Sequence, residues 1–245
     1  MAEPVLRTEG LRKAFGGLVA TDAVSIDVAP GEIHALIGPN GAGKTTLVAQ
    51  LTGQLPCDSG RIVFDGSDIT RLKTHARVAR GLRRSFQITS VLRNFTALDN
   101  VALAVQAHQG HSFRFWSPAR ADAGLRVPAR GLLEQVGLGD RAGVVAANLS
   151  HGEQRQLEIA MALAGTPRLL LLDEPMAGMG PEESARMTGF LKDLKGRYAI
   201  LLIEHDMDAV FALADRITVL VYGRVIASGS PDEIRNDPEV RQAYL

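Results

Sequence analysis

The chain has 245 residues, of which 46% are hydrophobic, and its 27 basic residues balance its 27 acidic residues. That length suffices for one large domain or two small ones. A formal net charge of zero gives no electrostatic reason to expect a nucleic-acid partner. The single cysteine, Cys57, excludes an internal disulfide framework and agrees with a reducing compartment.

The sequence predicts no membrane-spanning or secretory segment. The longest apolar runs, 169–172 and 199–203, are far shorter than the ~20 residues of a membrane span. They are typical of buried parallel strands. The first four residues lack the basic and apolar regions of a signal peptide. We therefore expect any membrane role to come from a partner.

In the first third of the chain, strand signals surround one glycine-rich run. Residues 5–28 alternate loosely and predict short antiparallel strands with a turn at Phe15-Gly16-Gly17. A strand is predicted over 32–37, and a helix opening at Thr45 and stopping at Gly53 follows. A further strand over 61–64 and a short basic helix over 75–81 come next.

Between that strand and helix lies a phosphate-binding loop of spacing G-x-x-x-x-G-K-T. It comprises Gly38, Pro39, Asn40, Gly41, Ala42, Gly43, Lys44, Thr45 and Thr46. Its glycines permit a backbone curl whose amides converge on an anion, and the helix adds its positive dipole end. We expect Lys44 to reach terminal phosphates and the Thr45 hydroxyl to hold Mg2+.

Helical patterns dominate residues 91–164, and the arginine-bearing stretch 110–128 is irregular and expected to be partly loop. The last third then alternates between strands and helices. Strands are predicted at 169–172 and 198–203, with a hairpin over 217–227. The intervening helices open at Pro181, near Met207, at the Ser230 capping box and at Pro238. This alternation predicts a parallel sheet with helices on its faces, interrupted by the helical middle stretch.

Two acidic residues follow the apolar strand at 169–172, at the end where an open parallel sheet binds ligands. Asp173 is placed to hold Mg2+, directly or through water. Glu174 is placed to polarise a water molecule that attacks a γ-phosphorus. Beside a phosphate loop, the pair predicts nucleotide hydrolysis.

The stretch 148–154, Asn-Leu-Ser-His-Gly-Glu-Gln, resembles the L-S-G-G-Q signature of the ATP-binding cassette (ABC) family. His151 replaces the first glycine and Glu153 the glutamine. Taken alone, the stretch is as compatible with an ordinary helix cap as with an anion site. The resemblance implies that Ser150, Gly152 and Glu153 contact ATP.

Further roles are implied only by this resemblance. His205 is expected to contact the γ-phosphate and the catalytic glutamate. Gln87 is expected to touch Mg2+ and to link the site to a membrane partner. Phe15 is expected to stack on adenine, although alone it is nearly as compatible with a core position. Gly180 stands where the family carries an aspartate, so communication through that aspartate is not carried over.

The resemblance implies an α/β P-loop NTPase fold with a parallel-sheet core, a small antiparallel β subdomain and an inserted helical subdomain. We expect a single ABC ATPase domain over 1–245. Its nucleotide-binding core takes residues 1–88 and 165–245, and its helical subdomain takes residues 89–164.

The resemblance also implies partners. Two ATPase chains, alike or different, are expected to hold ATP and Mg2+ between the phosphate loop of one and Ser150 and Gly152 of the other. Two membrane permeases are expected to dock near Gln87 and 88–107, at the cytoplasmic face of the inner membrane, and to receive cargo from a solute-binding protein. No nucleic-acid partner is expected.

Several segments resemble the ATPase subunits of branched-chain amino acid importers. They are Phe15-Gly16-Gly17-Leu18, the insertion 109–128, the run 203–207 and the tail 236–245. Two alternatives stay open: the ATPase of a lipopolysaccharide-type exporter, and a soluble ABC ATPase acting on DNA or ribosomes. The ATPase does not touch the solute, so the sequence does not specify the cargo.

Overall fold

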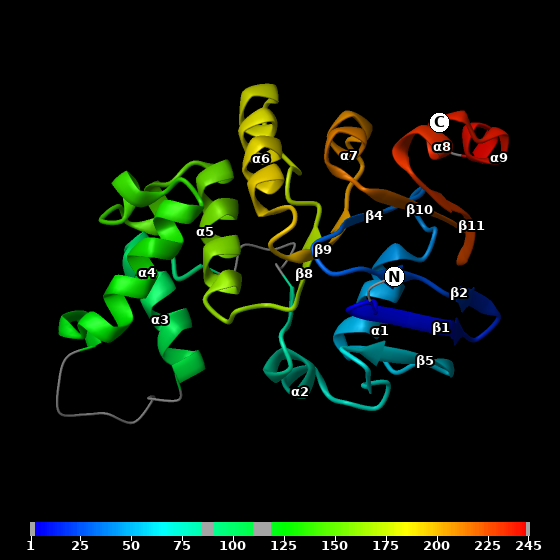
Figure 1. The fold of residues 1–245 in the computed structure, drawn as a ribbon, viewed down its shortest axis with the longest axis horizontal. Coiled ribbons are helices and arrows are strands. Elements are labelled where there is room, and N and C mark those ends of the chain that lie inside the picture. The colour runs from blue at the N-terminus through cyan, green and yellow to red at the C-terminus, as the bar shows by residue number, and fades with distance from the viewer. Residues whose placement is uncertain (1–2, 85–90, 110–118, 244–245) are drawn as a thin grey trace. The chain divides into compact units, whose positions relative to one another are not determined.

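The computed structural model describes residues 3–84, 91–109 and 119–243. By their internal contacts the residues form two compact units, whose elements are labelled in Figure 1. The first unit comprises 1–84, 168–174 and 194–245. The second comprises 85–167 and 175–193.

A six-stranded sheet of order β11-β10-β4-β9-β8-β7 lies at the centre of the first unit. Its neighbours run parallel, except for the antiparallel hairpin of β10 and β11. The strands are β4 (Ile33–Ile37), β7 (Leu82–Arg84), β8 (Leu169–Asp173), β9 (Ala199–Ile203), β10 (Arg216–Val221) and β11 (Arg224–Gly229). Every residue of β4, β8 and β9 is buried, which is why these strands are almost entirely aliphatic. The predicted parallel core is confirmed.

A second, antiparallel sheet belongs to the same unit. Its longest strand, β1, pairs with β2, β3 and β5, and β5 pairs with β6. The strands are β1 (Leu6–Phe15), β2 (Leu18–Val24), β3 (Asp27–Val28), β5 (Ser59–Phe64) and β6 (Ser67–Asp68). The predicted small antiparallel sheet is therefore present, with its first turn at residues 16–17.

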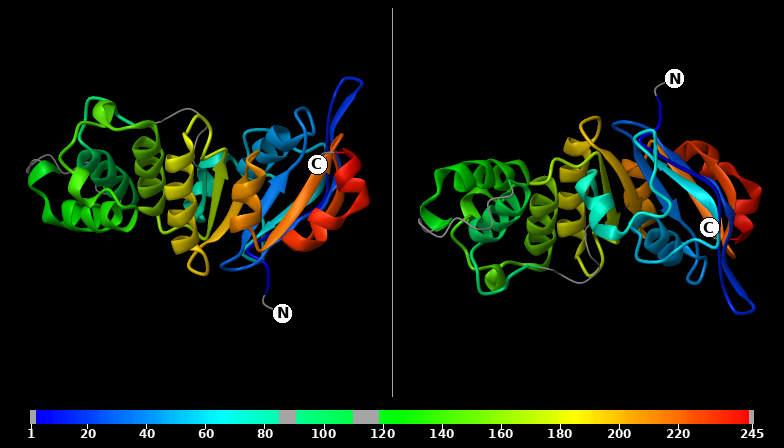
Figure 2. Two further views of the ribbon diagram at one scale, coloured as in Figure 1. Left: turned by 90° about the horizontal axis from the view of Figure 1, so that it is seen from above. Right: turned by 90° about the horizontal axis from the view of Figure 1, so that it is seen from below.

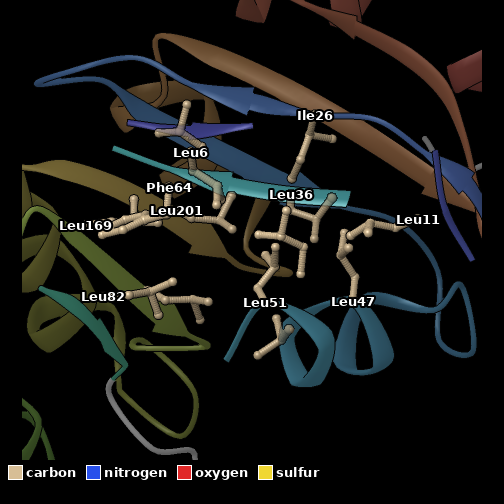
Figure 3. Packing of buried hydrophobic residues seen from close by; sticks show 14 of the residues in the cluster. Leu6, Leu11, Ile26, Leu36, Leu47, Leu51, Phe64, Leu82, Leu169 and Leu201 are labelled. Carbon is tan, nitrogen blue, oxygen red and sulfur yellow. The ribbon is translucent and has the colours of Figure 1, made fainter. Parts of the chain in front are cut away.

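The core of the first unit joins the two sheets and helix α1 (Lys44–Thr52). Figure 3 shows leucines of α1 and side chains of both sheets gathered in one cluster. Leu36, Leu47, Leu51 and Phe64 are essentially without exposure to solvent. Since burying one such side chain contributes roughly 2 kcal/mol, this cluster fixes the position of α1 and of the loop that precedes it.

A buried arginine anchors the far end of α1. Arg77, in α2 (Thr74–Ala79), is 2% exposed. Its Nη1 donates to the carbonyls of Gln50 and Leu51, at 2.7 and 2.8 Å. These carbonyls lie in the last turn of α1, where the amide of Gly53 reaches only that of Gln50, so the guanidinium adds a second donor to one and caps the other. The basic helix predicted from the sequence therefore supplies structural support.

The C-terminal helices cover the other side of the main sheet. They are α7 (Met207–Leu213), α8 (Pro231–Asn236) and α9 (Pro238–Ala243). Val210, Ile234 and Val240 are buried with Ile217 in one cluster. The predicted capping box at Ser230 is confirmed, with Ser230 and Glu233 exchanging side-chain and backbone hydrogen bonds.

The second unit is helical (Figure 2). Helices α3, α4 and α5 pack against one another. Its elements are α3 (Ala97–Gln109), η1 (Ala119–Ala121), α4 (Ala123–Gln135), η2 (Gly139–Arg141), η3 (Ala146–Asn148), α5 (His151–Leu163) and α6 (Pro181–Leu194), whose last residue belongs to the first unit. Within the described ranges, no helix has the length and apolarity needed to cross a membrane.

The stretch 110–128 was expected to be irregular and partly loop. Residues 110–118 lie outside the described residues, and in the remainder α4 begins at Ala123 and runs through Pro128. Proline removes the amide that would bond the carbonyl of Gly124. That carbonyl instead accepts from Nε2 of Gln109, at 3.3 Å. The side chain of Asp122 caps the helix by accepting from the Gly124 amide at 2.8 Å. A helix is thus tolerated across a proline, in a stretch expected to be partly loop.

Burial of His34 predicts that the stability of the first unit depends on pH. Its Nε2 lies 2.7 Å from Thr218 Oγ1. Burial lowers the pKa of His34 to about 4, against the attraction of Glu32. Because the unfolded chain binds the proton more readily, stability is full above the unfolded pKa and is lost as pH falls. We expect a loss of about 2 kcal/mol between about pH 7.5 and about pH 5.

Urea unfolding followed by circular dichroism at both pH values measures this loss. His34→Gln keeps a polar partner for Thr218 and should make the pH dependence shallower. An equally steep dependence in the variant would assign the effect to other groups.

Candidate functional site

Three adjacent strands of the main sheet end at one edge, and each is followed by predicted site residues. The phosphate loop follows β4, Asp173 closes β8 with Glu174 after it, and His205 follows β9. β9 lies between β4 and β8, with Asp173 in register with Ile203. The amide of Glu174 donates to the carbonyl of Ile203 at 2.9 Å. The carboxyl ends of these strands therefore bring the three segments together.

The loop is pressed against neighbouring backbone at two glycines. A Cβ on Gly38 would lie 2.0 Å from the carbonyl oxygen of Leu220, and one on Gly43 would lie 2.1 Å from that of Ala20. Gly43, with φ of 102°, is also the N-cap of α1. Only glycine fits these approaches. The loop therefore curls tightly into the N-terminus of α1, a position that favours phosphate.

Lys44 lies within this curl and is 8% exposed. Its Nζ donates to the carbonyls of Gly38 and Pro39. Burial lowers the pKa of Lys44, and the nearby carboxylates of Glu174 and Asp173 oppose that shift. The ammonium group therefore lies in the field of both acids, as a phosphate-binding lysine should.

The two acids at the carboxyl end of β8 have different partners. Asp173 Oδ2 accepts from Arg84 Nη2 at 2.7 Å, and both side chains are largely buried. Glu174 Oε1 lies 2.9 Å from Nε2 of His205. Glu174 has a φ of 48°, a left-handed conformation rare for its residue type. Strain of this kind clusters at functional sites, where surrounding structure holds it.

The donors at this edge suit Mg2+. The Asp173 carboxylate and the Thr45 hydroxyl, in the first turn of α1, are hard oxygen donors of the kind this ion prefers. Among the described residues, no group of three or more His, Cys, Asp or Glu side chains could hold a metal ion. A cation here would share its coordination with phosphate oxygens and water, which is the usual mode for Mg2+.

The predicted signature residues lie in the second unit, at the start of α5. Ser150 is the N-cap, and its Oγ accepts from the Glu153 amide at 3.3 Å. In return, Glu153 Oε2 accepts from the Ser150 amide at 2.8 Å. Arg141 Nε lies 2.9 Å from the other oxygen of Glu153. The carboxylate of Glu153 is thus committed to capping its own helix.

Gly152, also in the first turn of α5, is close to helix α6. A Cβ at Gly152 would lie 3.3 Å from Glu183 Oε1. Glycine therefore lets the first turn of α5 pass close to that acidic side chain.

Phe15 and Gln87 are the remaining predicted site residues. Phe15 ends β1 and is 50% exposed, which excludes the alternative of a core position. Lys13 Nζ lies 5.7 Å from the centre of the Phe15 ring, and Asp58 holds that ammonium at 2.6 Å. The ring is thus supported from one side and available for stacking. Gln87 lies outside the described residues.

Sequence reasoning missed three charged neighbours of these residues. They are Arg84 at Asp173, Arg141 at Glu153 and Glu183 at Gly152. Each is distant in sequence from its neighbour or belongs to no motif. An arginine ending a three-residue strand gives no pattern from which its partner could be read.

A phosphate loop after β4, two acids after β8 and a parallel sheet with these connections define the fold of a P-loop nucleotide-binding ATPase. Residues 21–177 match the family model described as ABC transporter. The chain belongs to this ABC transporter family. Residues 224–245 match a second model, described as branched-chain amino acid ATP-binding cassette transporter.

Individual relatives agree with this assignment. The high-affinity branched-chain amino acid transport ATP-binding protein BraF of Pseudomonas aeruginosa is 38% identical, with 100% of this chain and 99% of the relative covered. The lipopolysaccharide export system ATP-binding protein LptB of Escherichia coli is 34% identical, with 98% and 96% covered. Among solved structures, the ADP conformation of MJ1267, an ATP-binding cassette of an ABC transporter, gives a TM-score of 0.87 at 31% identity, with 99% of each chain covered.

The close approach at Gly38 predicts a difference between two loop substitutions. Gly38→Ala should lower the free energy of unfolding by about 3 kcal/mol, because the new methyl group meets Leu220 backbone. Gly41→Ala is the matched control, since its positive φ is strained while its Cβ meets no atom within 4 Å. Its cost should be about 1 kcal/mol. Equal losses in chemical unfolding would show that the loop relaxes away from β10.

Proposed function

We propose that this chain is the ATP-hydrolysing subunit of a multi-subunit ABC importer for branched-chain amino acids or a related small solute. The observation that carries this proposal is full-length similarity to a branched-chain amino acid transport protein, joined to the matching C-terminal family model. The geometry at the carboxyl edge of the sheet supports the hydrolytic part. The proposal for the solute comes from the relatives alone.

In the proposed mechanism, the loop and its lysine bind the phosphates of ATP. Residues 38–46 offer backbone amides and the N-terminus of α1 to the anionic chain. Lys44 exchanges its loop carbonyls for terminal phosphate oxygens, and the attraction of Asp173 and Glu174 keeps it charged. Phe15 offers its exposed ring to adenine.

Glu174 is the proposed general base and His205 its positioning partner. When His205 Nε2 carries the proton, it donates to Glu174 Oε1 at 2.9 Å and fixes the carboxylate. Oε2 is then left to accept a proton from the attacking water. Asp173 and Thr45, with Gln87 as implied by the family, would hold Mg2+, which when bound neutralises charge developing on the phosphate oxygens.

We further propose that two such chains share each nucleotide. Ser150 and Gly152 form a helix N-terminus in the second unit, and an anion is the ligand that such a terminus favours. The capping box keeps this turn formed, and Arg141 balances the charge of Glu153. Glu153 is thus proposed to act through Ser150, as a capping residue beside the shared nucleotide.

The membrane partners are proposed from the relatives. Two permease subunits would bind the ATPases at the cytoplasmic face of the inner membrane, and a solute-binding protein would deliver cargo to the permeases. Similarity to the lipopolysaccharide export protein keeps an exporter as the second candidate. Its lower identity and the branched-chain family match at 224–245 favour the importer. Similarity to transport ATPases along almost the whole chain disfavours a soluble ATPase acting on nucleic acid.

Uptake in the host organism tests the importer. Deleting the gene should abolish high-affinity uptake of radiolabelled leucine, and the wild-type gene, but not its Glu174→Gln form, should restore it. Normal leucine uptake together with defective lipopolysaccharide at the cell surface would replace the importer with the exporter.

Glu174→Gln should keep ATP affinity within about threefold of wild type while lowering hydrolysis at least a hundredfold, since the amide cannot take a proton from water. Lys44→Ala should instead weaken ATP binding, because the phosphates lose their cation. Calorimetric titration and phosphate release separate the two effects. Wild-type turnover in Glu174→Gln would refute its role as base.

Mixing two inactive variants tests whether sites are shared. Ser150→Ala removes the cap from one chain, and Lys44→Ala disables the loop of the other. Their heterodimer would contain one intact site, so hydrolysis should recover to at most half of wild type. ATP hydrolysis is measured on heterodimers purified from separately tagged chains. Recovery in no mixture would contradict a shared site.

A further inference from the structure

Arg84 lies on β7, the outermost strand of the main sheet, and its side chain contacts Asp173, the proposed metal-binding acid. It ends β7, where it is in register with Leu171 of the parallel strand β8. Asp173 lies two residues beyond Leu171 and so projects from the same face. The guanidinium spans this gap, with Nη2 2.7 Å from Asp173 Oδ2. Its second nitrogen, Nη1, donates to Gln54 Oε1 at 3.0 Å.

We propose that Arg84 is a positioning residue that holds one oxygen of Asp173 and thereby limits the affinity of this carboxylate for Mg2+. The inference rests on the proposed function, because it takes Asp173 as a ligand of that ion. It adds a residue that belongs to neither the phosphate loop nor the acidic pair.

The two oxygens of Asp173 are not equally available to a cation. A charge-assisted hydrogen bond of 2.7 Å occupies one lone pair of Oδ2, in the direction of β7, and draws charge away from that oxygen. Bidentate coordination of a cation by both oxygens then competes with the ion pair. Gln54 resists that break, because it anchors the opposite side of the same guanidinium.

The guanidinium of Arg84 also repels a cation. An arginine side chain does not lose its proton in a protein, so its charge is permanent. The side chains of Arg84 and Asp173 are only 14% and 11% exposed, which leaves little solvent to screen a divalent cation from the guanidinium. The pair therefore opposes Mg2+ until the phosphates of the nucleotide add their own negative charge.

A second arginine–aspartate pair in the same unit provides a control. Arg168 Nη2 lies 2.8 Å from Asp65 Oδ1, but these side chains are 57% and 50% exposed. The pair has the same chemistry and similar length, it lies on the surface, and it touches none of the proposed site residues. Removing it should leave the metal dependence of nucleotide binding unchanged.

The test measures how strongly Mg2+ and ATP binding are coupled. ATP affinity is determined by calorimetry with saturating Mg2+ and in EDTA, with every protein also carrying Glu174→Gln so that ATP is not consumed. The ratio of the two affinities should rise roughly three- to tenfold in Arg84→Met, which lies within the range for groups in direct contact. Arg84→Lys keeps the charge but loses the bond to Gln54, so its ratio should rise by no more than about twofold. Arg168→Met should stay close to the parent.

Gln54→Ala releases the guanidinium without touching Asp173 and should raise the ratio about twofold. An unchanged or lower ratio in Arg84→Met overturns the inference. If circular dichroism shows that Arg84→Met does not fold, Gln54→Ala decides, and an unchanged ratio there overturns it. Absence of ATP binding in the parent protein would refute the proposed function itself, an outcome distinct from unchanged coupling.

Discussion

Parallel pairing of β4, β9 and β8 is the constraint on which the candidate site depends. Each strand is short and fully buried, so a shift in its register would move aliphatic side chains out of the core. The same register sets how far each strand extends before its polar residues begin. It places the loop after β4, His205 after β9 and the acids after β8 at one edge. The positions of the site residues are thus a consequence of how the buried strands pack in the core.

The elements that could be predicted from the sequence are those with a recognisable pattern in a short stretch of residues. The loop 38–46 and the aliphatic run 169–172 have patterns that physical arguments can interpret, and the helix cap at Ser150 was one of two open interpretations. The structure shows the capping hydrogen bonds. Contact between this helix end and a nucleotide held by a second chain is a proposal. The exposure of Phe15 likewise resolved an ambiguity that composition could not.

What the sequence could not provide are contacts between distant segments. Arg84 and Asp173 are 89 residues apart, and no periodicity connects them. The helix through Pro128 was hidden for a similar reason, because the group that compensates for the missing amide comes from Gln109 in another helix. In both places the decisive contact is one hydrogen bond between different elements.

The hairpin of β10 and β11 has a consequence for how this chain tolerates change. Its turn residue Gly223 donates to the carbonyl of Ala42 at 2.8 Å and accepts from the amide of Asp22 at 2.8 Å. The shape of the phosphate loop therefore depends on a hydrogen bond from a turn nearly two hundred positions later in the sequence. Inserting a residue at the exposed tip beside Phe15 should lengthen only a surface turn. Inserting one at Gly223 would break the hydrogen bond that holds the phosphate loop. Relatives with intact phosphate loops should therefore preserve the length of that hairpin.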